Sequence, residues 1–319
     1  MFNKDKINFK VEKFDLKYMG GNLDSYLINL SSDLGVGLRR TDTGQPLAVV
    51  SKSYEPVQYL DLVEELEQAI TLSGIDLTGA TFTTDVIGEG EQLELTARFP
   101  AHEGNIDGKN DRVVPQFKFR TSHNRTWANN GMMGYFRQMC YNTLVDCNKL
   151  AYVYGRHSKN FSVPSFASKI RAASQYISGE GLNKMKAWYN IPLSRNAAIL
   201  LFTNTLAKKK NNVTMANEPN KVMLSNLMKI FDEENRHLLG KGLYQKYNSM
   251  DNGTLWTAYQ AATSWSTHTD KPNGRVFREE RVRKMMESPY FTMHAGSVRE
   301  IANVELKVAE EVAGLKVDG

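Results

Sequence analysis

Two short runs of alternating residues constrain this chain most, because they predict a β-hairpin that any fold of it has to contain. Alternate residues of Phe82–Val86 and of Leu93–Phe99 are suited to a buried face, and Gly88-Glu89-Gly90 separates the two runs. A period of two is typical of a strand with one buried face. Glycine accepts the positive φ angles of tight turns, so the segment predicts two antiparallel strands.

Two more segments add a second hairpin and a helix to this prediction. Residues 35–38 and 46–50 flank Asp42-Thr43-Gly44, a sequence typical of a hairpin turn. Residues 59–72 carry apolar side chains at helical spacing and predict a helix. At 319 residues, with an ordinary apolar content of 41%, the chain is long enough to bury a core.

A third strand is predicted over residues 113–120. Its odd positions are apolar and are expected to face the core, whereas its even positions, which include Lys118 and Arg120, are expected to face outward. Pro115 lacks a backbone donor and therefore favours an edge strand or a bulged one. The two cations on the outer face are the first candidates for binding a ligand.

Beyond this strand the pattern changes to that of helices. A helix with Arg137 and Tyr141 on one face is predicted from an apolar stripe of Phe136, Met139, Cys140, Leu144, Cys147 and Leu150. Further helices are predicted at 165–177, 194–207, 221–236, 254–265, 278–286 and 298–312. The aromatic residues of 254–265, Trp256 and Tyr259 among them, are expected to pack in the core.

These elements together predict an α+β fold. A hairpin-rich N-terminal and central sheet with a β-β-β-α core is followed by a helical C-terminal part. The polar stretch 208–220 is the best linker candidate. It divides a mixed α+β part, residues 1–207, from a mainly helical part, residues 221–319.

Positive charge is concentrated between Val113 and Lys186. This segment holds eleven Lys and Arg residues against two acids, a net charge of +9, whereas the whole chain carries +5. Nine aromatic residues lie between Phe117 and Phe161. Cations neutralise phosphates and aromatic rings stack on any base, so the pattern favours single-stranded nucleic acid. The alternative is a solvated basic face over an ordinary aromatic core.

Two stretches hold most of the candidate contacts. In 118–127, two strand cations lead into a polar loop whose hydroxyl, amide and N–H groups suit phosphate oxygens, although Trp127 is equally a core anchor. In 152–159, cations follow two tyrosines at a predicted helix end, where they also serve as helix caps. The predicted nucleic-acid-binding residues are Lys118, Arg120, Arg125, Trp127, Arg137, Tyr141, Asn142, Tyr154, Arg156, His157 and Lys159.

The sequence contains no familiar catalytic motif. P-loop, zinc-protease, nucleophile-elbow and dinucleotide-binding patterns are absent, and none of the six histidines pairs with Cys or His at ligand spacing. Asp85, Glu91 and Glu94 offer an alternative, a magnesium-dependent nuclease. Cys140 and Cys147 are interpreted as buried apolar side chains. We therefore favour a protein without catalytic activity and predict neither a metal nor a cofactor.

No stretch of about 18 uncharged apolar residues occurs, so no membrane span is predicted. The first residues, Met1 to Lys6, lead into polar sequence rather than the apolar core of a signal peptide. We therefore expect a cytoplasmic protein.

Four ordered segments resemble the phage and plasmid family catalogued as domain of unknown function 932. They are Arg40–Gln58, Cys140–Leu144, Arg156–Ser158 and the block from Leu255 to His268. The residues before Cys140, Gln138 and Met139, depart mildly from the family's usual pattern. The resemblance implies a phage or plasmid context and brings no catalytic residue with it.

The β-β-β-α core is also similar to the core of the ring-forming single-strand annealing recombinases, a likeness at the level of fold. It implies a phage protein that binds single-stranded DNA, with RNA as an alternative, and anneals strands during recombination or replication. We expect a homo-oligomer, with a ring as one form. Two other hypotheses are a counter-defence or host-takeover protein that binds a host protein through its helical part, and the nuclease.

Overall fold

The structure is a computed structural model of the chain. It describes residues 1–18, 28–29, 35–107, 111–127, 129–144, 152–154, 163–208, 220–238, 252–268 and 274–295. These residues combine antiparallel sheets with a helical C-terminal part, so the predicted α+β class is confirmed.

The chain folds into two compact units that alternate along the sequence. The first comprises Met1–Glu103, Val114–Gly134 and Asn148–Ser178, and the second comprises Gly104–Val113, Tyr135–Cys147 and Gly179–Gly319. Most of the predicted linker, residues 209–219, lies outside the described residues. A division into 1–207 and 221–319 therefore stays a prediction.

The first unit contains the two predicted hairpins and the predicted helix between them. Its elements are η1 (Asp5–Ile7), β1 (Val11–Phe14), β2 (Lys17–Tyr18), β3 (Ile28–Asn29), β4 (Val36–Arg40), β5 (Pro46–Val50), α1 (Tyr59–Ser73), β6 (Thr81–Ile87), η2 (Gly88–Gly90), β7 (Gln92–Arg98), η3 (Pro100–His102), β12 (Tyr152–Tyr154) and α2 (Val163–Tyr176). Strands β4 and β5 pair antiparallel, as do β6 and β7. At the second turn Gly90 has a φ of 116°, which explains the glycine there.

Two long strands, β9 (Arg112–Ser122) and β10 (Asn130–Arg137), contribute residues to both units. The sheet order is β11-β10-β9-β7-β6, where β11 is Asn142–Leu144; strand β12 pairs with β10, and β8 (Gly104–Asn105) pairs with β9. Strand β9 is therefore interior, and the expectation of an edge strand was wrong. Pro115 lies between Val113, which pairs with β8, and Gln116, which pairs with β7, so its missing N–H removes no bond to either strand.

The predicted helix over 136–150 was also wrong. The chain instead forms β10, a turn and β11 (Asn142–Leu144), and the tyrosines expected at the helix end belong to strand β12. Strand β10 is buried along nearly its whole length, on both of its faces. Such a strand loses the period-two pattern, and its apolar residues then imitate helical spacing.

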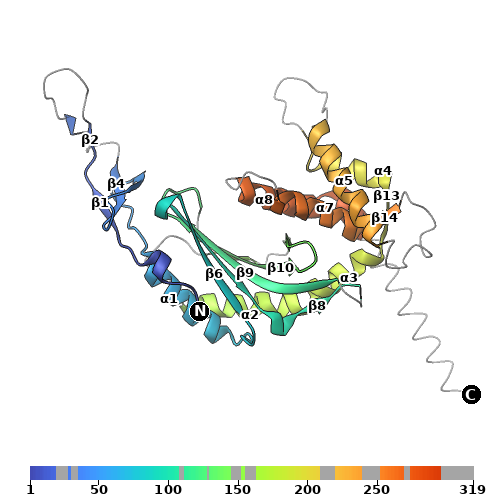
Figure 1. The fold of residues 1–319 in the computed structure, drawn as a ribbon, viewed down its shortest axis with the longest axis horizontal. Helices are drawn as coiled ribbons and strands as arrows, with labels where there is room; N and C mark the ends of the chain where they lie inside the picture. The colour runs from blue at the N-terminus through green and yellow to red at the C-terminus, as the bar shows by residue number, and fades with distance from the viewer. Residues whose placement is uncertain are drawn as a thin grey trace, which may run out of the picture. The chain divides into compact units, whose positions relative to one another are not determined.

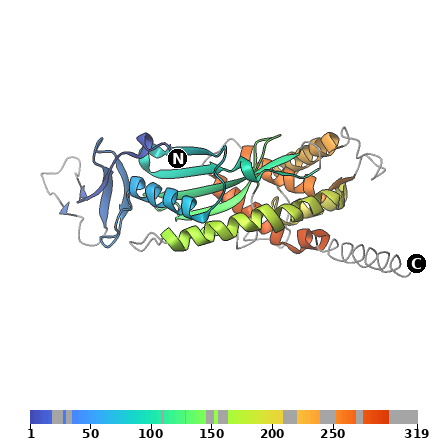
Figure 2. The same ribbon diagram turned by 90° about the horizontal axis from the view of Figure 1, so that it is seen from below.

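The core of the first unit lies between the sheet and helices α1 and α2, which run along one face of β6, β7 and β9 (Figures 1 and 2). Phe117 and Phe119 of β9 meet Phe166 of α2 edge to face, with ring centroids 6.3 and 6.0 Å apart. The odd positions of β9 therefore face the core, as predicted.

The second unit is mainly helical. Its elements are β8 (Gly104–Asn105), β11, α3 (Leu182–Asn190), β13 (Pro192–Ser194), α4 (Arg195–Asn204), α5 (Lys221–Leu238), β14 (Asn252–Thr254), α7 (Leu255–His268) and α8 (Arg275–Glu287). Predicted helices α2, α4, α5, α7 and α8 are confirmed, whereas residues 298–312 lie outside the described part.

Helix α7 runs through the centre of the second unit and supplies its aromatic core, as expected. Trp256 and Tyr259 are fully buried, and Tyr259 packs against Trp188 of α3 at 5.1 Å between ring centroids. Helix α3 itself escaped sequence reasoning. It follows a π-helical turn, Ile177–Gly181, whose glycines hide the continuation of the helical pattern.

Candidate functional site

The two cations expected on the outer face of β9 lie in the interior. Lys118 and Arg120 are 4% and 7% exposed, and both approach Glu94 of the neighbouring strand β7. Arg120 Nε donates to Glu94 Oε2 at 2.5 Å, and Lys118 Nζ lies 3.8 Å from Glu94 Oε1. The alternation along β9 was correct, but both faces of this strand are covered. The predicted exposure of Lys118 and Arg120 was therefore wrong.

The loop after β9 carries two further predicted residues. Arg125 is exposed and has a φ of 65°, whereas Trp127 is half-buried. The Ser122 hydroxyl accepts from the Trp127 backbone N–H at 2.9 Å, and the Arg120 guanidinium lies 5.8 Å from the Trp127 ring centroid. Trp127 thus anchors the loop in part, which leaves Arg125 as its exposed cation.

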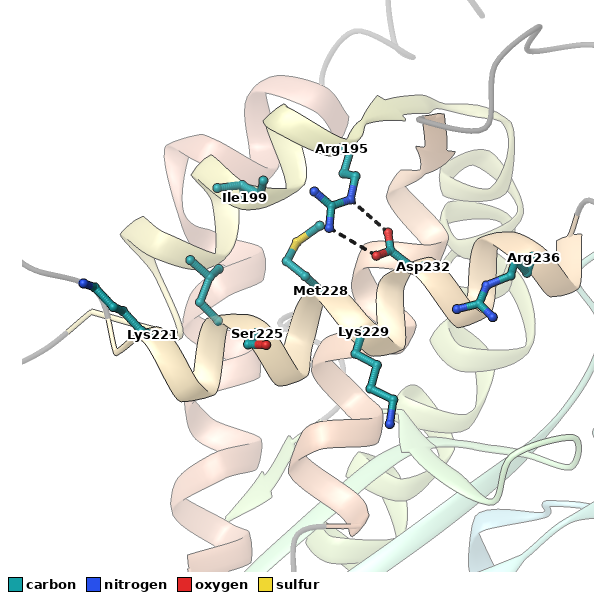
Figure 3. A pocket seen from close by; sticks show the side chains of 9 residues that line it. Arg195, Ile199, Lys221, Ser225, Met228, Lys229, Asp232 and Arg236 are labelled. Carbon is teal, nitrogen blue, oxygen red and sulfur yellow. Dashed lines mark hydrogen bonds and ion pairs between the residues drawn. The ribbon is translucent and has the colours of Figure 1, made fainter.

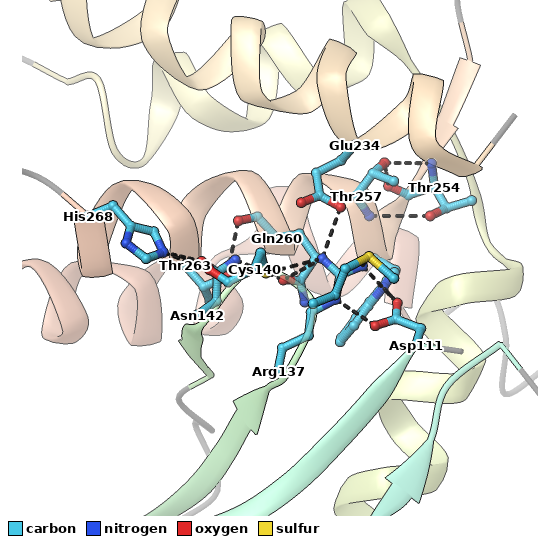
Figure 4. A network of polar contacts seen from close by, with 12 residues as sticks. Asp111, Arg137, Cys140, Asn142, Glu234, Thr254, Thr257, Gln260, Thr263 and His268 are labelled. Atoms are coloured by element: carbon cyan, nitrogen blue, oxygen red, sulfur yellow. Dashed lines mark hydrogen bonds and ion pairs between the residues drawn. The ribbon is translucent and has the colours of Figure 1, made fainter. Parts of the chain in front are cut away.

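Arg137 forms the centre of a buried polar network in the second unit (Figure 4). Its Nε and Nη2 donate to the two carboxylate oxygens of Asp111 at 2.6 and 2.8 Å. Its Nη1 donates to Glu234 of α5 at 2.9 Å and to Gln260 of α7 at 3.2 Å. The Trp256 indole N–H donates to Asp111 at 3.0 Å. Arg137 is fully buried, so it joins β10 to two helices rather than facing solvent.

The electrostatics of this network favour a permanently charged guanidinium. Burial alone would lower the pKa of Arg137, but the hydrogen bonds to Asp111 and the charges of Glu234 and Asp111 outweigh burial and raise it. A bidentate Arg–carboxylate pair fixes both distance and orientation. The network therefore holds the end of β10 rigidly against α5 and α7.

The donor and acceptor roles in the network follow from Arg137, because a guanidinium can only donate. Gln260 must therefore turn Oε1 toward Arg137, and the same oxygen accepts from Asn142 Nδ2 at 3.1 Å. Asn142 Oδ1 is then left to face His268 Nε2 at 2.9 Å, and the Cys140 carbonyl lies equally close to that nitrogen. Both partners accept, so Nε2 of His268 carries a proton and donates to them.

Cys140 lies beside these hydrogen bonds, but they do not activate its thiol as a nucleophile. Its Sγ lies 3.5 Å from Arg137 Nη1, and the residue is half-buried with a free thiol. Burial raises the pKa of the thiol, and the charge of Arg137 opposes that rise only in part. A protonated thiol is a poor nucleophile. Cys140 was expected as a buried apolar side chain, whereas the structure shows it half-buried and beside a guanidinium. Cys147 lies outside the described residues.

Tyr141, between Cys140 and Asn142, extends into solvent. Its side chain is 68% exposed, and its φ of 56° lies in the left-handed region that non-glycine residues avoid. The Phe136 ring meets it edge to face at 5.7 Å. Arg137 and Asn142 pair across the β10–β11 hairpin, so the buried network fixes both ends of the turn that presents Tyr141.

Two of the four motif segments found in the sequence meet in this cluster. Cys140–Leu144 and the Leu255–His268 block lie side by side through Asn142, Gln260 and His268. Sequence reasoning missed Asp111, Glu234 and Gln260, which lie 26, 97 and 123 residues from Arg137, because no local pattern in a single sequence links such positions. Tyr154 belongs to β12, and Arg156, His157 and Lys159 lie outside the described residues.

A second surface in the same unit combines exposed cations with an apolar floor. Helices α4 and α5 enclose a cleft of about 450 Å³ (Figure 3). Arg195 of α4 forms an ion pair with Asp232 of α5 at 3.2 Å across it. Three further cations rise from α5 and form no ion pair with any described residue: Lys221, Lys229 and Arg236. The floor consists of Ile199, Leu224 and Met228.

Within the described part of the chain, no group of three or more Cys, His, Asp or Glu side chains is placed to hold a metal ion. The three acids of the nuclease hypothesis have separate surroundings. Glu94 is buried against its two cations, Asn124 donates to Glu91 Oε2 at 2.9 Å, and Asp85 is exposed on β6. No helix in the described ranges has the length and apolarity needed to cross a membrane.

Comparison with known proteins gives one match. A family model described as "Domain of unknown function (DUF932)" matches residues 46–304, which is most of the chain. No curated protein and no solved structure matches. The matched range contains the Arg137 network, Tyr141 and the cleft between α4 and α5.

Proposed function

The chain belongs to the family described as Domain of unknown function (DUF932), and because that description names no activity, we propose a function from the described surfaces. The protein binds single-stranded DNA and anneals complementary strands. Annealing holds two strands in place and makes or breaks no bond, so it needs only cations that neutralise phosphates and a surface on which bases stack.

The observation that carries the proposal is the cationic cleft between α4 and α5. Four cations line it against a single acid, and that acid already pairs with Arg195. Lys221, Lys229 and Arg236 stand along one helix and are exposed, so a phosphate chain reaches them without breaking an internal ion pair. By contrast, Lys118 and Arg137 are ion-paired in the interior. We therefore assign the neutralisation of phosphates to the exposed cations of the cleft.

Tyr141 supplies the stacking surface. An aromatic ring that is 68% exposed, at a φ that costs conformational energy, is typical of a position kept for contact with a ligand. Stacking contributes about 1–3 kcal/mol per base and accepts any base.

The proposed setting is phage recombination or replication, in the cytoplasm of the host, with the protein acting as a homo-oligomer. Single-stranded RNA is the alternative ligand, because cations and a tyrosine ring do not distinguish the two backbones. Neither a metal nor a nucleotide cofactor enters this mechanism.

The test is fluorescence anisotropy with a labelled single-stranded oligonucleotide, titrated at several salt concentrations with a duplex competitor. For single strands the logarithm of the binding constant falls with a slope of about 0.7 per phosphate contact. Lys229→Glu with Arg236→Glu should therefore weaken binding and reduce the slope by about 1.4. Lys10→Glu with Lys208→Glu changes the net charge equally, at exposed positions outside the cleft, and should leave the slope unchanged.

Tyr141 is tested separately by Tyr141→Asn, which keeps a residue that tolerates a positive φ and removes the ring. Affinity should fall about 5- to 150-fold, the equivalent of about 1–3 kcal/mol of stacking. Tyr290→Asn removes another exposed tyrosine of the same unit and should have no effect. Absence of single-strand binding by the unmodified protein at low salt would refute the proposal and turn attention to a protein partner.

A further inference from the structure

The cleft between α4 and α5 is lined by both apolar and cationic side chains, a chemistry that suits an amphipathic helix as well as a phosphate chain. Its lining combines three apolar side chains with cations spread along α5. Lys221 and Arg236 are fifteen residues apart, which corresponds to about 22 Å along a helix. A partner of matching chemistry would carry an apolar stripe with acids on its flanks.

Such a segment exists at the C-terminal end of this sequence. Residues 298–312 place Ile301, Val304, Val308 and Val312 at spacings of three and four, which is one face of a helix. Glu300 and Glu311 flank this stripe on one side and Glu305 on the other, at 100° per residue. From Glu300 to Glu311 the acids extend over about 16 Å of helix, within the length of the cation row.

We propose that residues 298–312 dock as an acidic amphipathic helix in the α4–α5 cleft of the same chain. The valine and isoleucine stripe covers Ile199, Leu224 and Met228, and the flanking glutamates approach Lys221, Lys229 and Arg236. The docking itself is independent of the proposed nucleic-acid function. Its consequence rests on that function, because a docked acidic helix would compete with single-stranded DNA for the same cations.

Zero-length carbodiimide cross-linking of the full chain tests the docking without any DNA. The expected products join Lys221 or Lys229 to Glu305 or Glu311. Two exposed pairs serve as internal standards, Lys4–Glu64 at 3.3 Å and Lys13–Glu55 at 3.1 Å. If the standards link and the cleft lysines do not link to residues 298–312, the proposal is overturned.

A pair of variants separates docking from nonspecific attraction. Val304→Asp with Val308→Asp disrupts the apolar stripe and should reduce the cleft cross-links at least tenfold. Asn303→Asp adds charge on the opposite face of the predicted helix and should leave them unchanged. Equal yields from the two variants would overturn the proposal, because the stripe would then have no role.

Mixing isotope-labelled and unlabelled chains shows whether the docked segment belongs to the same chain or to a second copy. Links confined to one isotope form support docking within a chain, whereas mixed links assign the cleft to a second copy and overturn the proposal as stated. The stripe variant should also bind single-stranded DNA more tightly. Cross-links that form as expected, together with an unchanged DNA affinity, support the docking and count against the cleft as the DNA site.

Discussion

Replacing Arg137 with methionine is the sharpest test of the buried network. The Arg137 and Asp111 side chains are each 1% exposed and share hydrogen bonds of 2.6 and 2.8 Å. Without the guanidinium, the Asp111 carboxylate stays in the interior with the Trp256 indole N–H, at 3.0 Å, as a side-chain donor. Removing one partner of a buried ion pair costs about 3–5 kcal/mol, because the other charge remains uncompensated.

Urea unfolding followed by tryptophan fluorescence measures this loss. We expect the free energy of unfolding of Arg137→Met to fall by about 3–5 kcal/mol. At about 2–4 °C per kcal/mol, the melting temperature should fall by about 6–20 °C. A parallel experiment by circular dichroism checks that both probes report the same transition, which a single free energy requires.

The matched control is Arg195→Met, the same substitution at an exposed pair. Arg195 is 43% exposed and bonds Asp232 at 3.2 Å, so its loss should cost no more than about 1 kcal/mol. Asp111→Asn added to Arg137→Met should recover part of the stability, since the fully buried Asp111 charge is then removed, with a coupling of about 1–3 kcal/mol. Equal costs for the two methionine variants would refute the reasoning.

Three further predictions test individual side chains. Glu94→Gln removes the carboxylate between two buried cations and should cost about 3–5 kcal/mol, whereas Glu12→Gln at an exposed pair should cost less than about 1 kcal/mol in the same urea assay. Burial raises the pKa of Tyr59 far above its usual value, so above about pH 10 only the unfolded chain releases this proton and stability falls by about 1.4 kcal/mol per pH unit. Tyr59→Phe should remove that part of the slope, and an unchanged slope would contradict the assignment. In a Cys147→Ser background, a thiol reagent should modify Cys140 more slowly at pH 7 than a cysteine in a peptide, since burial raises its pKa, and fast labelling would contradict this.

Strand β6 and helix α1 were predictable because each has a single buried face, which gives β6 a period of two and α1 a clean apolar stripe. Strand β7 is buried on both faces, but its apolar residues still alternate with polar ones, so the same period marks it. The period then identifies the element, and the glycines at 88 and 90 locate the turn. Local patterns of this kind need no knowledge of distant residues.

Strand β10 failed for the opposite reason. It is buried on both faces and contains two glycines, so neither a period of two nor a strand-rich composition marks it. Phe136, Cys140 and Leu144 happen to be four residues apart although they lie on a strand, a turn and another strand. The helix predicted there combined side chains from three elements into one stripe.

The candidate site was predictable in part. Tyr141 and Asn142 were singled out within a short motif, and the structure places one in solvent and the other in the network. The partners that define the network, Asp111, Glu234 and Gln260, come from a loop and two helices far away in the chain. Their role depends on tertiary contacts, which a single sequence does not encode in any local pattern.

Charge counted along a chain is a different quantity from charge presented in space. The net +9 between residues 113 and 186 includes Lys118, Arg120 and Arg137, yet the acids that neutralise them, such as Glu94 and Glu234, lie outside that window. A net charge summed over residues 113–186 includes these cations, but it leaves out the acids that pair with them, which lie elsewhere in the chain. The exposed cations of α5 lie in a stretch that also holds several acids and attracts no notice by composition, although Lys229 and Arg236 are the ones that meet solvent. For a ligand such as a phosphate chain, only unpaired and accessible charge counts, so the decisive substitutions belong on α5 rather than on β9.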